Sequence, residues 1–175
     1  MQISIMQTSA HIQAIYIASN AGAPMESKTT VEVQADFGIK GDRYASGMGA
    51  FSDRQPPKIR HISLIASSGI AIANLWLEAS NEAPFADSET RRNVVLDGIS
   101  PSALNSLVGQ IFQLGGVSLR GTELCAPCVR PGELVGKSDF LDAFDQRGGI
   151  RAEILSSGTI STGDALFIGN QKLHD

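Results

Sequence analysis

Hydrophobic residues along this chain fall mainly in short runs whose β-branched content and partial alternation predict strands. Gly, Asn, Asp and Pro bound these runs, and 18 glycines divide the chain into short pieces. There is no internal repeat, low-complexity tract or linker. The predicted strands cover residues 12–18, 30–34, 61–66, 92–96, 110–114, 116–120, 150–155 and 164–168.

Three helices are predicted between the strands. The clearest covers residues 68–79, where an apolar stripe recurs at helical spacing and Ser67 or Ser68 is the expected N-cap. Shorter helices are predicted at 101–107 and 138–146. Because the strands do not alternate regularly with helices, this pattern favours a mainly β fold with flanking helices, a closed or partly closed barrel, over a parallel α/β sheet.

Length and composition are typical of one folded domain over residues 1–175, since the chain is 42% hydrophobic. A net charge of −4 without any block of like charge argues against nucleic-acid or membrane-surface binding, but allows a small basic pocket. The first residues lack a signal-peptide pattern, and no apolar stretch approaches the roughly 18–20 residues of a membrane span. We therefore expect a soluble cytoplasmic protein.

The two cysteines, Cys125 and Cys128, form a CxxC within GTELCAPCVRPGEL, residues 121–134. A structural disulfide is disfavoured in the cytoplasm, and the three histidines lack the spacing that would complete a zinc site. A thioredoxin-like redox pair requires a following helix, which Pro131 and Gly132 are expected to stop. On the residues alone, a zinc half-site, a redox pair, two incidental thiols and one reactive thiolate all stay open.

A glycine-rich stretch, FGIKGDRYASGMGAF at 37–51, is a candidate anion-binding loop. Its glycines permit positive φ and close backbone approach, Arg43 offers a guanidinium fork for a phosphate, and Asp42 is expected to fix the turn. The alternative is an ordinary turn with an Asp–Arg surface pair.

A second basic stretch, ETRRNVVL at 89–96, is expected to be a strand. A strand would place Arg91 and Asn93 on one face and Arg92 on the other. The first face would then present a guanidinium fork and an amide together, able to hold a phosphate or a pterin edge. The alternative is an edge strand that carries solubilising charge.

In this order, these stretches resemble the MOSC domain, the module named after the C-terminal part of molybdenum cofactor sulfurase, which also occurs as small stand-alone bacterial proteins. The resemblance runs from about residue 12 to 169 and includes IYIASNAGAPM, RHISLIASSGI and RGGIRAEILSSGTISTGD. It implies a β-barrel with flanking helices, in agreement with the strand pattern, and a role in binding the molybdenum cofactor (molybdopterin) or carrying sulfur to it.

The resemblance also implies roles for individual residues, in a site expected at one end of the barrel. Cys128 matches the thiolate that ligates molybdenum, and the same thiolate would hold a persulfide in a sulfur carrier. Ser19-Asn20 stands where cofactor-binding relatives have a Lys-Ser pair, and we expect Arg130 to supply the missing cation. The implied cofactor-binding residues are Arg43, Arg91, Asn93, Ser19, Asn20 and Arg130.

As an enzyme, such a protein would reduce N-hydroxylated compounds with electrons from a separate flavin or iron–sulfur protein, because the chain has no flavin fingerprint and too few cysteines for a cluster. As a sulfur carrier it would need a donor of the cysteine desulfurase type. The chain is too short to include the pyridoxal-phosphate domain of the sulfurases, so we expect no bound pyridoxal phosphate. The alternatives are a non-catalytic cofactor carrier or chaperone, and a barrel that has lost the cofactor.

Overall fold

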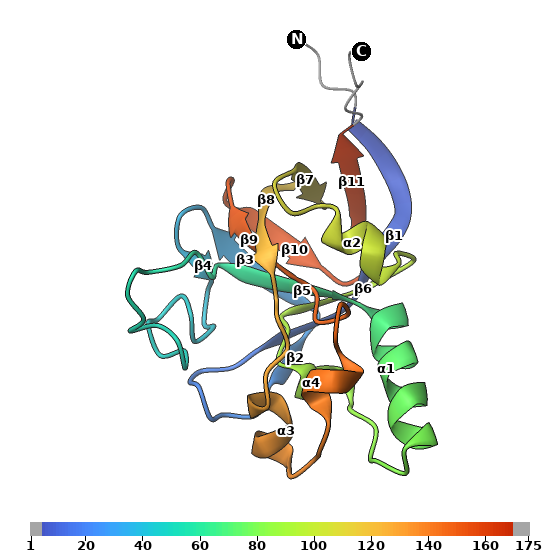
Figure 1. Cartoon of the computed structure of the whole chain (residues 1–175). Coiled ribbons are helices and arrows are strands. Elements are labelled where there is room, and N and C mark those ends of the chain that lie inside the picture. The colour runs from blue at the N-terminus through green and yellow to red at the C-terminus, as the bar shows by residue number, and fades with distance from the viewer. Residues whose placement is uncertain (1–4, 170–175) are drawn as a thin grey trace.

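A computed structural model describes residues 5–169, and its main feature is a closed barrel of seven strands (Figure 1). The barrel strands follow the order β11-β7-β8-β9-β5-β6-β1, and β1 also pairs with β11. The β5–β6 pair is parallel and the other neighbours are antiparallel, so the barrel is mixed. The strands are β1 (Ile5–Ile17), β5 (Ile62–Ala66), β6 (Val94–Asp97), β7 (Ile111–Leu114), β8 (Val117–Leu124), β9 (Ile150–Ile154) and β11 (Ala165–Gly169).

Smaller elements surround the barrel. Strand β2 extends the sheet beside β1, and β10, β3 and β4 form a second, three-stranded sheet. Helices α1, α3 and α4 gather at the end of the molecule opposite the start of β1 and the end of β11 (Figure 1). These elements are β2 (Glu26–Lys28), β3 (Thr30–Gln34), β4 (Gly38–Ile39), β10 (Gly158–Ser161), α1 (Ser67–Ala79), the 3-10 helix η1 (Asp87–Thr90), α2 (Pro101–Asn105), α3 (Arg130–Val135) and α4 (Phe140–Ala143).

Side-chain alternation along β5 and β6 divides the core in two. Leu64 and Val94 point into the barrel, where the larger apolar cluster lies. Ile65 and Val95, one residue further along each strand, belong to a second cluster under α1 and α4. Because successive strand residues face opposite sides, two neighbouring strands can serve both cores. The continuous apolar runs in the sequence therefore mark strands that are covered on both faces.

Helix α1 confirms the prediction for 68–79, and its apolar stripe is buried. The predicted caps are wrong. The N-cap is Ala66, which makes no side-chain cap hydrogen bond. The Ser67 hydroxyl donates to Asp97 at 3.2 Å, and the Ser68 hydroxyl donates to the Ile99 carbonyl at 2.9 Å. Both serines therefore tie the start of α1 to the end of β6.

The two other predicted helices are shorter than expected. Helix α2 ends at Asn105. Helix α4 lies inside the predicted range 138–146, because Asp139 adopts a left-handed conformation at φ 63° and the helix begins only after it. Helix α3 was not predicted at all. Pro131 lies in its first turn, where a proline leaves no needed donor missing, so the expectation that this residue stops a helix was wrong.

All eight predicted strands are present; most bounds differ by no more than a few residues, but β1 begins at Ile5, well before the predicted residue 12. The strands that were missed, β2, β4 and β10, are two to four residues long. In β10 only Ile160 is buried, so its sequence carries no alternating pattern that would distinguish it from a loop. Within residues 5–169, no helix is long and apolar enough to span a bilayer.

Candidate functional site

A pocket of about 330 Å³ lies against the outer face of the barrel wall. Ser63 on β5 and Arg151 on β9 are cross-strand partners, and both line it. Their neighbours along each strand belong to the barrel interior, so these two side chains face outward. The site was expected at one end of the barrel; the structure places it beside the wall. Residues 43–60 and 123–131 contribute most of the remaining lining.

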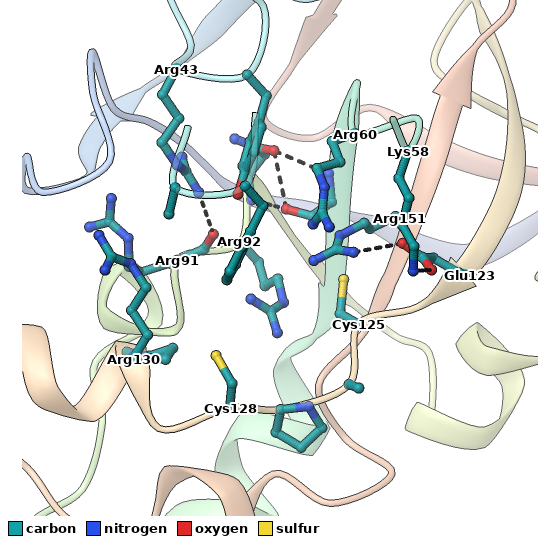
Figure 2. A pocket seen from close by; sticks show the side chains of 18 of the residues that line it. Arg43, Lys58, Arg60, Arg91, Arg92, Glu123, Cys125, Cys128, Arg130 and Arg151 are labelled. Atoms are coloured by element: carbon teal, nitrogen blue, oxygen red, sulfur yellow. Dashed lines mark hydrogen bonds and ion pairs between the residues drawn. The ribbon is translucent and has the colours of Figure 1, made fainter. Parts of the chain in front are cut away.

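Five of the predicted site residues meet in this pocket, although they come from distant segments. Arg43, Arg91, Asn93, Cys128 and Arg130 all line it. Figure 2 shows the guanidinium groups of Arg91 and Arg130 close together on one side of the pocket, with Cys128 below them. The cysteine and the basic stretch therefore line the same concave pocket, as expected.

The two opening-loop residues, Ser19 and Asn20, are exposed and are not among the lining residues. The Asn20 side-chain oxygen accepts hydrogen bonds from the backbone N–H groups of Gly22 and Ala23, at 3.2 and 3.0 Å. Such bonds fix a turn, as asparagine commonly does. Asn20 therefore shapes the loop whose backbone borders the pocket, and its own side chain points elsewhere.

Arg91 is held by that loop. Its Nη1 donates to the Ala23 carbonyl at 2.8 Å and its Nη2 to the Ala21 carbonyl at 3.1 Å. Arg130 donates to the same Ala21 carbonyl at 3.2 Å, so the two guanidinium groups are neighbours. Burial, together with the charges of Arg43 and Arg130, lowers the pKa of Arg91 to about 10. This side of the pocket therefore concentrates positive charge that an anion would stabilise.

Asp42 is buried behind the lining residues Arg43 and Asn93, with 1% of its surface exposed. One carboxylate oxygen accepts hydrogen bonds from the Ala18 N–H at 3.2 Å, from Arg43 Nη1 at 3.1 Å and from Asn93 Nδ2 at 3.3 Å. The other accepts from the Tyr44 N–H at 3.2 Å. The glycine-rich loop is therefore fixed by Asp42, as predicted, and Arg43 is committed to an ion pair as well as to the pocket.

Asn93 has no hydrogen-bonding capacity to spare. Its side-chain oxygen accepts from the backbone N–H and the hydroxyl of Ser63, both at 3.1 Å. Its amide nitrogen donates to the Tyr16 carbonyl at 3.1 Å and to Asp42. Since an amide has two donor and two acceptor positions, all are occupied by the protein. Asn93 holds β1, β5 and the glycine-rich loop together.

The geometry of residues 91–93 differs from the prediction. Strand β6 begins at Val94, and Arg91 adopts a left-handed conformation at φ 62° as the C-cap that follows η1. Strand alternation therefore does not apply here, and the expectation that Arg92 points to the opposite face was wrong. Arg92 also lines the pocket, and its Nε donates to the Gly148 carbonyl at 2.7 Å.

Both cysteines are free thiols that line the pocket, with Cys125 buried and Cys128 partly exposed. The Cys125 N–H donates to the Gly149 carbonyl at 2.8 Å. A side chain at Gly148 would collide with the Cys125 carbonyl, so only glycine permits this approach. Within residues 5–169, no group of three or more His, Cys, Asp or Glu side chains is arranged to hold a metal ion.

The opposite side of the pocket was missed by the sequence reasoning. Lys58, Arg60, Arg151 and Glu123 gather there (Figure 2). A signal was present, because the stretch from 54 to 60, RQPPKIR, holds three cations and no acidic residue. The two prolines of this stretch predict a loop, but nothing in the sequence indicates that the loop folds over β5.

The pocket is strongly cationic in a chain whose net charge is −4. Among residues 5–169, eight Lys and Arg side chains line it, against a single lining carboxylate, Glu123. Concave sites lined by one sign of charge focus the electrostatic field and favour ligands of the opposite sign. The pocket therefore combines an excess of positive charge, which would favour an anionic ligand, with two thiols.

Comparison with known proteins agrees with this architecture. The chain resembles the crystal structure of the YuaD protein from Bacillus subtilis, with a TM-score of 0.76 and 19% identity; the match covers 98% of this chain and 100% of that chain. It also resembles the crystal structure of YiiM from Escherichia coli, with a TM-score of 0.61 and 16% identity, over 97% of this chain and 72% of that chain. For YiiM from Geobacillus stearothermophilus the TM-score is 0.65 and the identity 16%, over 93% of this chain and 76% of that chain. These likenesses concern the fold. A search of curated proteins found no match. Residues 60–167, more than half of the chain, match the MOSC domain, and the chain therefore belongs to the MOSC family.

Proposed function

We propose that the pocket binds the molybdenum cofactor, with the Cys128 thiolate as the protein ligand of the metal. The MOSC family is associated with this cofactor. The observation that carries the proposal is the position of Cys128 beside the crowded guanidinium groups of Arg91 and Arg130. In this proposal Arg91 and Arg130, with Arg43 behind them, hold the phosphate of the pterin.

The residues at this side of the pocket fit such a group. Within the described chain, Arg91 and Arg130 donate to backbone carbonyls and form no ion pair with a carboxylate. A phosphate would supply the missing negative charge and accept from both guanidinium forks. A thiolate is a soft donor that suits molybdenum. Arg130 would then replace the cation that the opening loop lacks.

The cofactor, when bound, supplies oxidation and reduction at molybdenum, and the chain supplies binding and orientation. Cys128 holds the metal, while Asp42 and Asn93 keep the surrounding wall in place. We propose the reduction of N-hydroxylated compounds with electrons from a separate flavin or iron–sulfur protein. A second candidate is sulfur transfer, in which Cys128 carries a persulfide from a donor of the cysteine desulfurase type. The partly exposed, free thiol of Cys128 favours this second candidate.

The test is the molybdenum and pterin content of protein purified from a host that makes the cofactor. Wild type is expected to retain both. Arg91→Lys keeps the charge but loses the fork and should bind more weakly, and Arg91→Ala should lose about tenfold or more in affinity. Arg120→Ala is the matched control, because Arg120 lies outside the pocket in an ion pair with Glu153. Wild type without molybdenum and pterin, or Arg91→Ala with wild-type content, would contradict the proposal.

Turnover with an artificial electron donor then separates the enzyme from a non-catalytic carrier. An enzyme should reduce an N-hydroxylated compound in proportion to its molybdenum content. A carrier should hold the cofactor without turnover and release it to another protein. A sulfur carrier should instead show a persulfide at Cys128, which is detectable by mass as one added sulfur atom.

A further inference from the structure

We propose that the pocket holds a second oxyanion site, formed by Arg60 with Lys58 and Arg151, which binds a carboxylate or phosphate group of the substrate. This inference deepens the proposed function and rests on it, because the cofactor is taken to occupy the side of Cys128. It assigns the substrate to a chemical class: compounds that carry an oxyanion as well as the group that is reduced.

Arg60 has donors that the protein does not use. Its Nη1 is buried and has no hydrogen-bond partner within residues 5–169. Arg91 and Arg92, in the same pocket, donate instead to backbone carbonyls. A buried donor without an acceptor is costly, and in native proteins such groups usually have a partner. An oxyanion in the pocket would be an acceptor of suitable charge.

Aromatic rings hold the Arg60 guanidinium in place without consuming these donors. Its central carbon lies 5.7 Å from the ring centroid of Tyr44 and 5.1 Å from that of Phe51. The same two rings also lie against neighbouring guanidinium groups, Tyr44 against Arg43 at 5.0 Å and Phe51 against Arg54 at 4.6 Å. Cation–π contacts stabilise the charge through the ring faces and consume none of the N–H donors.

The one carboxylate on this side is already occupied. Glu123 accepts from Lys58 at 2.9 Å and from Arg151 at 2.6 Å, one cation on each oxygen. Burial lowers the pKa of Arg60, and the charge of Arg151 acts in the same direction. The charge of Glu123 raises the pKa of Arg60, but both oxygens of Glu123 are engaged by the other two cations. A bound oxyanion would counter the two lowering effects, because it favours the charged form of the guanidinium.

The two cationic groups lie on different sides of the pocket. Figure 2 shows Arg91 and Arg130 on one side, Arg60, Arg151 and Lys58 on the other, and the cysteine segment between them. A substrate held by its oxyanion at Arg60 would therefore extend toward Cys128. Such a two-point attachment fixes the orientation of the reacting group, which a single contact cannot do.

Phenyl phosphate and benzoate are suitable probes, with phenol as the uncharged control. Each is titrated into isotope-labelled wild-type protein while backbone amide shifts are followed by NMR. We expect saturable shifts at Arg60, Glu123 and Arg151 with the two anions and none there with phenol. Saturation by phenyl phosphate alone would support the site and restrict its ligands to phosphates. Saturation by benzoate alone would support the site and restrict its ligands to carboxylates. Shifts at Arg91 and Arg130 without shifts at Arg60 would overturn it.

Substitution of Arg60 makes the test specific. Arg60→Met keeps an unbranched side chain and removes the guanidinium and its charge, so the Kd for the anions should rise about tenfold or more. Arg60→Lys keeps the charge but loses the guanidinium fork, so its Kd for the anions should lie between those of wild type and Arg60→Met. Arg120→Met should bind as wild type, since that arginine lies outside the pocket. If folded Arg60→Met and Arg60→Lys both bind as wild type, the inference is wrong.

The same titration on cofactor-loaded protein tests the assignment to substrate. Retained binding of the anions is expected. Loss of binding would show that the cofactor itself covers Arg60, which would overturn the assignment. The result is separable from the proposed function. If protein from a host that makes the cofactor retains no molybdenum or pterin but still binds anions through Arg60, the cofactor role is wrong and the oxyanion site stands.

Discussion

Asp42 joins three separate parts of the pocket wall, since its carboxylate accepts from Ala18 on the opening segment, from Arg43 and from Asn93. The Asp42–Arg43 ion pair is almost completely buried, with 1% and 8% of the side chains exposed. Removing one partner of a buried pair leaves the other charged and uncompensated, which is more costly than the loss of an exposed pair. The stability of the pocket wall therefore depends on this single carboxylate.

Asp42→Asn should lower the free energy of unfolding by about 3 kcal/mol or more, because the uncharged amide leaves Arg43 buried without a counter-ion. Urea unfolding followed by circular dichroism measures the change. Glu32→Gln is the control, since it removes an exposed ion pair with Lys40 and should have no measurable effect. Equal stability of Asp42→Asn and wild type would show that the network contributes little.

His61 predicts a pH dependence of stability. Burial lowers the pKa of His61, although Glu153 and Asp36 act in the opposite direction, and its Nδ1 accepts from the Ile154 N–H. A proton on that nitrogen would remove the acceptor. Below the unfolded pKa of about 6.5 the unfolded chain therefore takes up a proton that the folded chain resists, so stability falls as the pH drops from this value toward the folded pKa.

The prediction is that unfolding free energies measured above and below this pH window differ more for wild type than for His61→Asn. Asparagine retains an acceptor near the Ile154 N–H but does not titrate. If the unfolding free energy of His61→Asn has the same pH dependence as that of wild type, other groups cause that dependence.

The cysteine segment is held by backbone contacts with the chain just before β9. Gly148 lies against the Cys125 carbonyl, and Gly149 accepts from the Cys125 N–H. Arg92 adds a third contact by donating to the Gly148 carbonyl. The segment that presents Cys128 is therefore positioned by these two glycines.

Gly148→Ala should displace the cysteine segment, because the added methyl group would collide with backbone and backbone cannot rotate away. We expect a loss of about 1–3 kcal/mol in unfolding free energy and faster alkylation of the buried Cys125. Alkylation is measured in a Cys128→Ser background so that only one thiol reports. Gly116→Ala is the control, since a side chain there would meet no atom within 4 Å. Identical alkylation rates in the two variants would argue against this contact.

The elements themselves were largely predictable, and the exceptions have local physical causes. The β-branched runs at 61–66 and 150–155 became β5 and β9, because alternation and apolar content act through the backbone period. The sequence did not indicate that Arg91 is left-handed, since hydrogen bonds to the loop carbonyls of Ala21 and Ala23 hold it there. Helix α3 was missed because a proline in a first turn looks the same, in sequence, as a proline that ends a helix.

Closure of the barrel brings the site together, and this long-range step is what the sequence could not supply. The resemblance of motifs placed Arg43, Arg91, Asn93 and Cys128 in one site, and these four residues line one pocket. It did not indicate that Lys58, Arg60 and Arg151 line the same pocket. Those residues meet because β5 pairs with both β6 and β9 and because the loop before β5 folds back over that wall. An acidic chain therefore carries a cationic pocket that its net charge conceals.

The central claim is that one thiolate, at Cys128, serves the pocket. The most direct measurement is the molybdenum content of Cys128→Ser and Cys125→Ser beside wild type, all purified from a host that makes the cofactor and checked for folding by circular dichroism. We predict that Cys128→Ser falls to background and that Cys125→Ser, whose thiol is buried, retains most of the metal. Full retention in Cys128→Ser would contradict the ligand assignment, and equal losses in the two variants would indicate a paired-cysteine site instead.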